Sequence, residues 1–290
     1  MQTFIPTPPG FSFGETMRAH GWRSLLPFTW HEDTQTLERI ERLDNGRVVR
    51  LLLRAADDGL HIDTDADARD EAFIVAIVRR MLQLGLPMEA FHAFCDAHPA
   101  LGHVAGRGQG RLLVSPTLWE DCVKVICTTN TTWTQTKSMV ARIVNACGSG
   151  WPGDPARRTF PTPAQVAALP LPEFAEAAKL GYRAPAVYSL ARSIAGGSLD
   201  LETLCDPALS TPDVWKQLLA LRGVGPYAAS CLLIYMGRYG RVNVDSWARS
   251  LVGKELGRAA TDADVHAFFA PFGEWQALAY HFYPWAADGV

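Results

Sequence analysis

Long apolar runs are absent from this 290-residue chain, since no stretch approaches the roughly 20 residues that cross a bilayer. We therefore expect a soluble protein with no membrane partner. Net positive charge is lacking too: 27 basic residues against 30 acidic ones give −3, which by itself argues against a nucleic-acid-binding protein. The 6 cysteines are scattered and no two have C-x-x-C spacing. We expect neither an iron–sulfur cluster nor a zinc site, and thiols without a secretory signal indicate a reducing compartment.

Charge is unevenly distributed along the chain. Residues 56–98 are acidic, and residues 216–258 are basic apart from Asp245 and Glu255. The bases of the second segment are Lys216, Arg222, Arg238, Arg241, Arg249, Lys254 and Arg258. A local surface for an anionic partner is therefore compatible with the acidic total, although such charges can also merely solvate a helix face.

The hydrophobic pattern of the sequence changes from one typical of strands to one typical of helices near residue 69. Alternating segments at 37–43, 47–54 and 60–64 are joined by Gly-containing turns, which predicts an antiparallel meander. We expect a mainly α protein with a small antiparallel α+β domain at 1–68 and a helical body at 69–290. Helix starts are expected at Ser115-Pro116, Thr162-Pro163 and Thr211-Pro212, and helix ends at Gly148, Gly196 and Gly253. Residues 149–158 read as a surface loop.

The segment 211–236 predicts two helices joined by a glycine hairpin. Thr211 would cap the first helix, which stops before Gly223. Gly223 and Gly225 bracket Val224 and allow close approach to a ligand, while Pro226 opens a second helix with free N–H groups. Ala228, Cys231, Leu232 and Tyr235 would pack one face of that helix. Its N-terminus would attract an anion; a plain helix–helix turn is the alternative.

Asp245 follows an extended stretch, 242–244, and precedes a helix expected at 246–251. The purely structural interpretation of Asp245 is that it caps the N-terminus of this helix. Helix N–H groups would also keep its carboxylate ionised and aimed. Such a group can stabilise an oxocarbenium ion and orient or deprotonate water, which cleavage of an N-glycosidic bond requires.

Residues 211–249 resemble the helix-hairpin-helix GPD motif of base-excision DNA glycosylases, through Leu221-x-Gly-Val-Gly225, Val244-Asp245 and Arg249. The resemblance implies that architecture, with a catalytic segment at 242–253 and Asp245 as the catalytic residue. It places Gly223, Val224, Gly225 and Arg249 on DNA. It also implies that the backbone carbonyls of Leu219, Leu221 and Val224 hold a structural Na⁺ or K⁺.

Two further segments resemble the 8-oxoguanine branch. In 126–140, Ile-Cys-Thr-Thr-Asn places Asn130 where a loop asparagine fills the space of the flipped base, with Thr131, Thr132 and Gln135 beside it. An ordinary polar turn is the alternative. Residues 180–184, Leu-Gly-Tyr-Arg-Ala, match that branch too. Arg183 is expected to contact a DNA phosphate, and packing alone can explain Tyr182.

The departures from the family concern its chemistry. Bifunctional members carry a lysine two residues after the second hairpin glycine, and here that residue is Tyr227. The 5 lysines lie at Lys124, Lys137, Lys179, Lys216 and Lys254. Because a Schiff base needs an amine, we expect little or no strand cleavage. Tyr227 would stack on a flipped base, with core packing as the alternative.

Three more residues are candidates for the base pocket. Cys231 matches a pocket cysteine, while Tyr280 and His281 lie in an aromatic segment whose family equivalent lines the pocket. Core packing is the alternative for Cys231, and a satisfied core histidine is the alternative for His281.

The sequence thus predicts a monofunctional DNA glycosylase without a catalytic cofactor, acting as a monomer on damaged double-stranded DNA. Alkylated purines are the favoured substrate, with oxidised guanine next. The expected location is the cytoplasm and nucleoid in a bacterium, or the nucleus in a eukaryote. The rival hypotheses are a non-catalytic sensor of damaged DNA and a helical protein with no nucleic-acid role.

Overall fold

The computed structural model describes residues 1–285. Five antiparallel strands form one sheet in the order β1-β5-β4-β3-β2. Their bounds are β1 Gln2–Pro6, β2 Phe28–His31, β3 Thr36–Arg42, β4 Val48–Ala56 and β5 Gly59–Thr64. The predicted meander is confirmed as β3 to β5. The edge strands β1 and β2 were not predicted, because edge strands are short and carry weak alternation.

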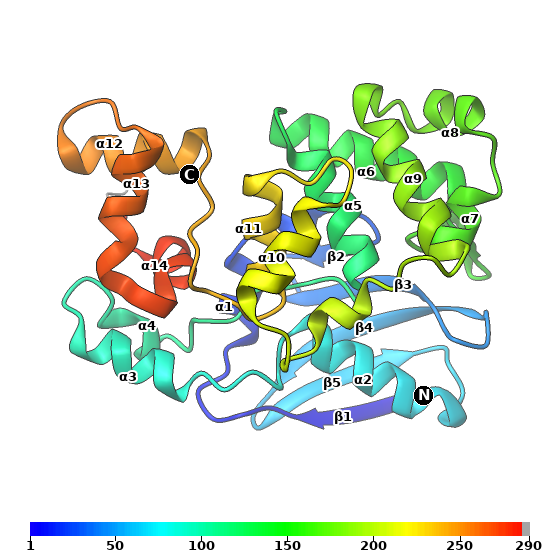
Figure 1. The fold of residues 1–290 in the computed structure, drawn as a ribbon. Coiled ribbons are helices and arrows are strands. Elements are labelled where there is room, and N and C mark those ends of the chain that lie inside the picture. Colours follow the sequence, from blue (N-terminus) through cyan, green and yellow to red (C-terminus); the bar gives the residue numbers. More distant parts are fainter. Residues whose placement is uncertain (286–290) are drawn as a thin grey trace.

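The main body is a group of helices above the sheet (Figure 1). One hydrophobic cluster joins inward residues of the sheet, such as Leu51 and Leu53, to side chains of these helices. The helices in it include α2 Glu71–Met81, α5 Leu118–Thr128, α6 Trp133–Cys147, α9 Ala184–Ala195, α10 Thr211–Leu219 and α11 Pro226–Tyr235. The sheet and these helices therefore share a core, and the predicted division at residue 68 stays a prediction.

A second hydrophobic cluster holds the C-terminal lobe together. Here α12 Ser246–Leu256, α13 Asp262–Phe269 and α14 Gln276–Phe282 pack with α3 Glu89–Ala97 and α4 His103–Gly106. Figure 1 shows this group standing beside the main body. The remaining short elements include α1 Phe13–Arg18, η1 Gly21–Ser24, α7 Pro163–Ala167 and α8 Leu171–Ala178.

Several helix boundaries differ from the sequence prediction. Thr162 caps α7, and Gly148 and Gly196 end α6 and α9 as predicted. By contrast, Thr117 caps α5 in place of Ser115, and Ser210 caps α10, so Thr211 lies inside that helix. In each case a nearby hydroxyl reaches the N3 backbone N–H, so a run of hydroxyl residues offered more than one cap.

Two other local predictions were wrong. Gly253 lies inside α12, which ends at Gly257 with φ +65°. Residues 149–158 contain a small hairpin, β6 Gly150–Trp151 with β7 Asp154–Arg158. The Trp151 Nε1 donates a 2.6 Å hydrogen bond to Asp65, which ties this hairpin to the chain that follows β5.

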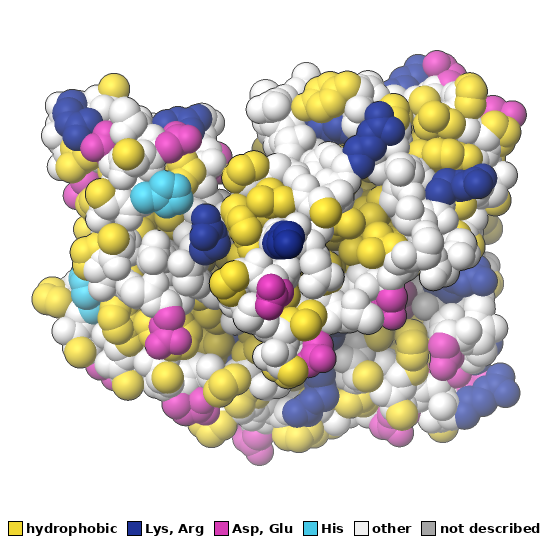
Figure 2. All heavy atoms as spheres, in the orientation of Figure 1, with side chains coloured by type: hydrophobic (Ala, Val, Ile, Leu, Met, Phe, Trp, Pro, Cys, Tyr) yellow, Lys and Arg dark blue, Asp and Glu magenta, His cyan; other side chains and the backbone are white. Residues whose placement is uncertain are grey.

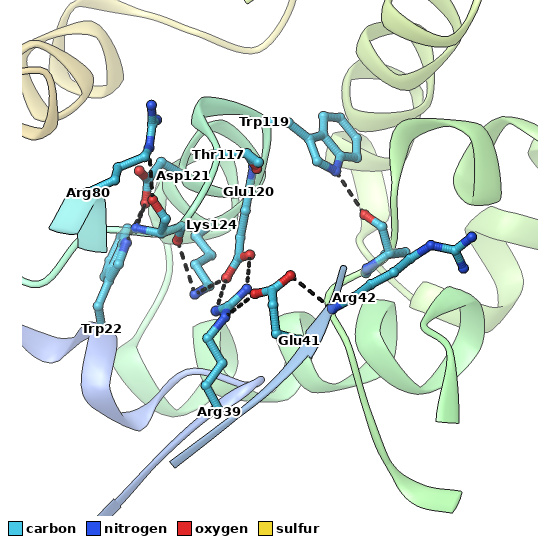
Figure 3. A network of polar contacts seen from close by, with 12 residues as sticks. Trp22, Arg39, Glu41, Arg42, Arg80, Thr117, Trp119, Glu120, Asp121 and Lys124 are labelled. Atoms are coloured by element: carbon cyan, nitrogen blue, oxygen red, sulfur yellow. Dashed lines mark hydrogen bonds and ion pairs between the residues drawn. The ribbon is translucent and has the colours of Figure 1, made fainter. Parts of the chain in front are cut away.

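A buried ion network joins the sheet to α5 (Figure 3). Arg39 of β3 donates two hydrogen bonds of 3.0 and 2.7 Å to Glu120, and the Lys124 Nζ lies 2.7 Å from the same carboxylate. Burial would raise the pKa of Glu120, but the charges of Arg39 and Lys124 outweigh it and hold the pKa at about 2. The network fixes α5, whose C-terminus leads into the Asn130 loop.

Candidate active site

A cleft of about 1320 Å³ separates the main body from the C-terminal lobe. Figure 2 shows the molecule notched between α12 and the helices around α11. Most of the residues predicted from the sequence line this cleft. They are Asn130, Thr131, Gly223, Val224, Gly225, Tyr227, Cys231, Asp245, Arg249, Tyr280 and His281. Segments more than a hundred residues apart therefore converge on one site.

Asp245 stands at the N-terminus of α12 and faces the cleft. Its backbone is extended, and its Oδ1 accepts a 2.7 Å hydrogen bond from the N–H of Ala248, so the predicted cap is confirmed. Burial raises the pKa of Asp245, while the N–H groups of Ala248 and Trp247 oppose that rise. The carboxylate is half-buried, so one side is fixed by the helix and the rest remains available to a ligand.

The hairpin glycines have different physical roles. Gly223 has φ +85°, and a Cβ there would lie 2.8 Å from the Cβ of Ala186. Gly225 caps α11, and a Cβ there would meet nothing within 4 Å. The N-terminus of α11 thus opens onto free space, as anion binding requires. The prediction that α11 packs by one face was wrong, because every residue from 228 to 234 is buried.

The hairpin carbonyls keep lone pairs for a further partner. The carbonyl of Leu221 accepts the Val224 N–H at 3.1 Å and keeps a second lone pair. Within residues 1–285, no backbone N–H outside helical ladders bonds to the carbonyl of Leu219 or of Val224. Leu219 ends α10 and Leu221 follows it closely, so their oxygens lie where the helix dipole favours a cation.

The loop between α5 and α6 presents Asn130. Asn130 is exposed with φ +46°, and Arg183 donates hydrogen bonds to the backbone carbonyls of Thr129 and Asn130. Gln135 accepts a 2.7 Å hydrogen bond from Thr131 and completes a capping box with Thr132. These side chains are therefore engaged in shaping the loop around Asn130.

Arg183 and Tyr182 differ from their sequence interpretations. Arg183 is only 8% exposed, and its guanidinium is bound to the loop carbonyls and is not at the surface where a phosphate would lie. Tyr182 is 69% exposed, so packing does not explain it. A hydrogen bond with Asn130 lowers the pKa of Tyr182, and the Arg183 guanidinium lies 4.5 Å from the centroid of its ring. Tyr182 and Asn130 thus form one projecting pair.

The wall of the cleft behind Asp245 is aromatic and uncharged. Cys231 and Tyr280 are each 6% exposed, while Tyr227 and His281 are half-buried. Burial raises the pKa values of Tyr227 and Tyr280, raises that of Cys231 to about 12 and lowers that of His281 to about 4. These groups are therefore neutral at pH 7. Cys231 belongs to the hydrophobic core and also lines the cleft, and the half-buried His281 lines the cleft too, so their role in a base pocket stays a prediction.

The sequence analysis missed a wall formed by the N-terminal region. His20 stacks on Tyr235 with ring centroids 5.4 Å apart, and Trp22 lies parallel to Trp133 at 6.5 Å. The Trp22 Nε1 donates a 2.8 Å hydrogen bond to the buried Asp121 (Figure 3). No motif marks residues 19–22, because only the packing of the sheet on α5 brings them to the cleft.

Part of the predicted basic surface is neutralised internally. Arg249 lies 2.7 Å from Asp262, and Arg258 lies 2.6 Å from Asp264. Arg238 donates to the backbone carbonyls of Leu209 and Asp206. Exposed ion pairs of this kind contribute little free energy, so Arg249, which lines the cleft, can exchange its partner for a phosphate.

Neither a metal cluster nor a membrane helix is found in residues 1–285. No group of three or more His, Cys, Asp or Glu side chains there could hold a metal ion. None of the helices within that range is long and apolar enough to cross a membrane.

The fold is that of the helix-hairpin-helix DNA glycosylases. The 3-methyladenine DNA glycosylase from Archaeoglobus fulgidus superimposes with TM-score 0.78 at 18% identity, over 97% of each chain. MBOgg1, solved with a low-affinity DNA ligand, gives 0.76 at 22% identity over 97% of this chain and 93% of its own. The 8-oxoguanine glycosylase/lyase from Clostridium acetobutylicum gives 0.76 at 17% identity over 99% and 96%. No protein-family profile matches the chain, and no curated protein matches it.

Proposed function

We propose that this protein is a DNA N-glycosylase in which Asp245 drives hydrolysis of an N-glycosidic bond. One observation carries the proposal. A carboxylate fixed by the N-terminus of α12 shares a cleft with the open N-terminus of α11, so a phosphate on α11 brings the neighbouring deoxyribose toward the carboxylate. Solved structures with the same fold include DNA glycosylases, one of them in complex with double-stranded DNA.

The chemistry needs a negative charge at the anomeric carbon. As the C1′–N bond breaks, the sugar becomes an oxocarbenium ion, which an ionised carboxylate stabilises in a water-poor site. Asp245 then orients water and accepts its proton. At the hairpin, the carbonyls of Leu219, Leu221 and Val224 would hold Na⁺ or K⁺, and that ion would add positive charge near a bound phosphate.

We further propose that the protein is monofunctional. Tyr227 occupies the position of the bifunctional lysine, and its phenol cannot form a Schiff base. No lysine belongs to the described residues that line the cleft, and the nearby Lys124 is 0% exposed and ion-paired with Glu120. Hydrolysis would therefore leave an intact abasic strand.

The walls of the cleft favour a cationic base. Tyr227 and Tyr280 offer aromatic faces, and the histidines beside them are neutral because burial lowers the pKa of His20 to about 3 and that of His281 to about 4. A purine made positive by alkylation is attracted to aromatic faces, and the two histidines of the cleft carry no charge that would repel it. We therefore place alkylated purines first, with oxidised guanine as the next candidate.

Extrusion of the base leaves a gap in the duplex, and we assign that gap to Asn130 and Tyr182. The pair projects from the rim of the cleft, and Asn130 can hydrogen-bond the orphaned base while the Tyr182 ring stacks beside it. The same pair also suits the rival function, a monomeric sensor that recognises distorted DNA and leaves the base in place.

A panel of lesion-bearing duplexes separates these functions. Each duplex is incubated with protein and then heated in alkali, which breaks strands at abasic sites. The proposal expects breaks only after alkali, strongest with alkylated purines, and none with Asp245→Asn. Tight binding without breaks on any lesion favours the sensor. Breaks before alkali, or a protein–DNA adduct trapped by borohydride, would overturn the monofunctional assignment.

A further inference from the structure

Asn243 carries an unused hydrogen-bond acceptor beside the candidate catalytic carboxylate. Its side chain is 6% exposed, and its Oδ1 is buried without any hydrogen-bond partner in residues 1–285. A buried unpaired amide oxygen is costly, of order 1–3 kcal/mol. Such a group calls for a partner that binds during function.

The position of Asn243 connects it to Asp245. Both residues line the same cleft, and they are two residues apart in the segment without regular secondary structure that leads into α12. Val242, which precedes Asn243, is 1% exposed and belongs to the core of the C-terminal lobe, and Val244, which lies between Asn243 and Asp245, packs against that core. Asn243 and Asp245 are thus presented together.

We propose that Asn243 and Asp245 hold the attacking water between them, an inference that rests on the glycosylase function proposed above. Water donates two hydrogens, and the site offers two acceptors: the Asn243 Oδ1 and the Asp245 carboxylate, which has lone pairs beyond the one used by Ala248. With both hydrogens engaged, a lone pair of the water oxygen points away from the protein, toward the sugar.

The reaction balances without any further group. The water oxygen bonds to C1′ as the C1′–N bond breaks, and the electron pair of that bond leaves with the base, where it neutralises the charge created by alkylation. One water proton passes to Asp245 and then to solvent. A chain without the attacking lysine needs water placed by its own residues, and Asn243 supplies the second contact.

Kinetics of Asn243 variants test this role. Base release is measured in a single turnover at saturating protein, and affinity is measured on a duplex carrying an uncleavable tetrahydrofuran abasic analogue. Asn243→Leu keeps the approximate volume and removes the acceptor, so release should slow by about 100-fold through misplaced water, with analogue affinity within about twofold. Asn243→Asp keeps an acceptor and adds a like charge that raises the Asp245 pKa. The acid limb of its pH–rate profile for base release should therefore move to higher pH.

Methanol provides a readout that a purely structural role would not move. Methanol donates one hydrogen, so it satisfies one acceptor and competes poorly in the wild-type protein. In Asn243→Leu the ratio of methyl deoxyriboside to abasic product should rise. The matched control is Tyr239→Phe, which removes another buried oxygen without a partner that lies outside the cleft. This variant should behave as wild type in every assay.

The outcomes separate the two proposals. A wild-type protein that releases no base from any lesion overturns the glycosylase function and this inference with it. If the wild type is active and Asn243→Leu releases base at the wild-type rate, the inference alone is overturned. The same holds if Asn243→Leu gives the wild-type ratio of methyl deoxyriboside to abasic product. If Asn243→Leu melts well below wild type, Asn243→Asp provides the test. A folded Asn243→Asp protein whose pH–rate profile has the same acid limb as wild type would contradict the role.

Discussion

The Oδ1 of Asp245 accepts a 2.7 Å hydrogen bond from the N–H of Ala248, so the candidate catalytic carboxylate is also the N-cap of α12. One residue thus has a structural role and a chemical role. The two can be separated, because asparagine caps a helix about as well as aspartate but carries no charge.

Asp245→Asn should abolish catalysis and preserve the fold. We expect base release to fall at least about 100-fold, as for loss of a general base, while the free energy of unfolding changes by less than about 1 kcal/mol. Thermal melting and alkali-revealed strand breaks measure the two effects. Asp245→Ala is the matched comparison and should lose both activity and about 1 kcal/mol. Full activity in Asp245→Asn would show that Asp245 is only a cap.

The rate should depend on pH through Asp245. Burial raises its pKa above the ordinary value of 3.8, and the active form is the ionised one. The rate should therefore rise with pH through the raised pKa, reach a plateau above it, and be lost as pH falls. A single-turnover pH profile gives the midpoint. A midpoint at or below 3.8 would contradict the desolvated environment of this carboxylate.

The two hairpin glycines should respond differently to alanine. Gly223→Ala strains a φ of +85° and meets Ala186 at 2.8 Å, so it should destabilise the protein by about 1–3 kcal/mol. Gly225→Ala has open space and an ordinary φ of −96°. Its methyl instead obstructs the approach of a phosphate to α11. Gly225→Ala should melt like wild type and bind DNA several-fold more weakly, which melting curves and fluorescence anisotropy would test.

Arg183 should act by shaping the Asn130 loop. Arg183→Ala should slow base release and increase hydrogen exchange in residues 129–131, because the carbonyls of Thr129 and Asn130 lose their donor. Arg183→Lys should fail to restore the rate, since an ammonium lacks the planar fork of guanidinium. A direct phosphate contact predicts the opposite. Arg183→Lys would then restore the rate, and Arg183→Ala would reduce the slope of log DNA affinity against log salt concentration by about 1.

The buried ion network should be sensitive to removal of a single member. Arg39→Met leaves Glu120 with only Lys124 in a site where all three side chains are at most 3% exposed, so stability should fall by about 3–5 kcal/mol. Arg39 also pairs with Glu41 at 2.5 Å, so replacing Arg39, Glu41, Glu120 and Lys124 together with apolar residues should recover most of that loss. Chemical denaturation measures both variants. A fourfold variant no more stable than Arg39→Met would contradict this account.

Local patterns in the sequence predicted the parts of the site that short-range physics controls. The Asp245 cap, the hairpin from Gly223 to Gly225 and the three central strands depend on neighbouring residues, and the structure has them as predicted. The caps of α5 and α10 were misplaced because several hydroxyls compete within a few residues, and the energy differences between such caps are small.

The sequence by itself determined one carboxylate at a helix start, one glycine hairpin and one exposed polar loop, because turns and caps are set by backbone conformation within a few residues. Only the tertiary structure decided which side chains share the cleft. His20 and Trp22 reach it because the sheet packs on α5, and Arg183 turns inward because the carbonyls of Thr129 and Asn130 lie within its reach. Asn243 could be recognised only from burial and the lack of a partner, since these properties depend on residues distant in the chain.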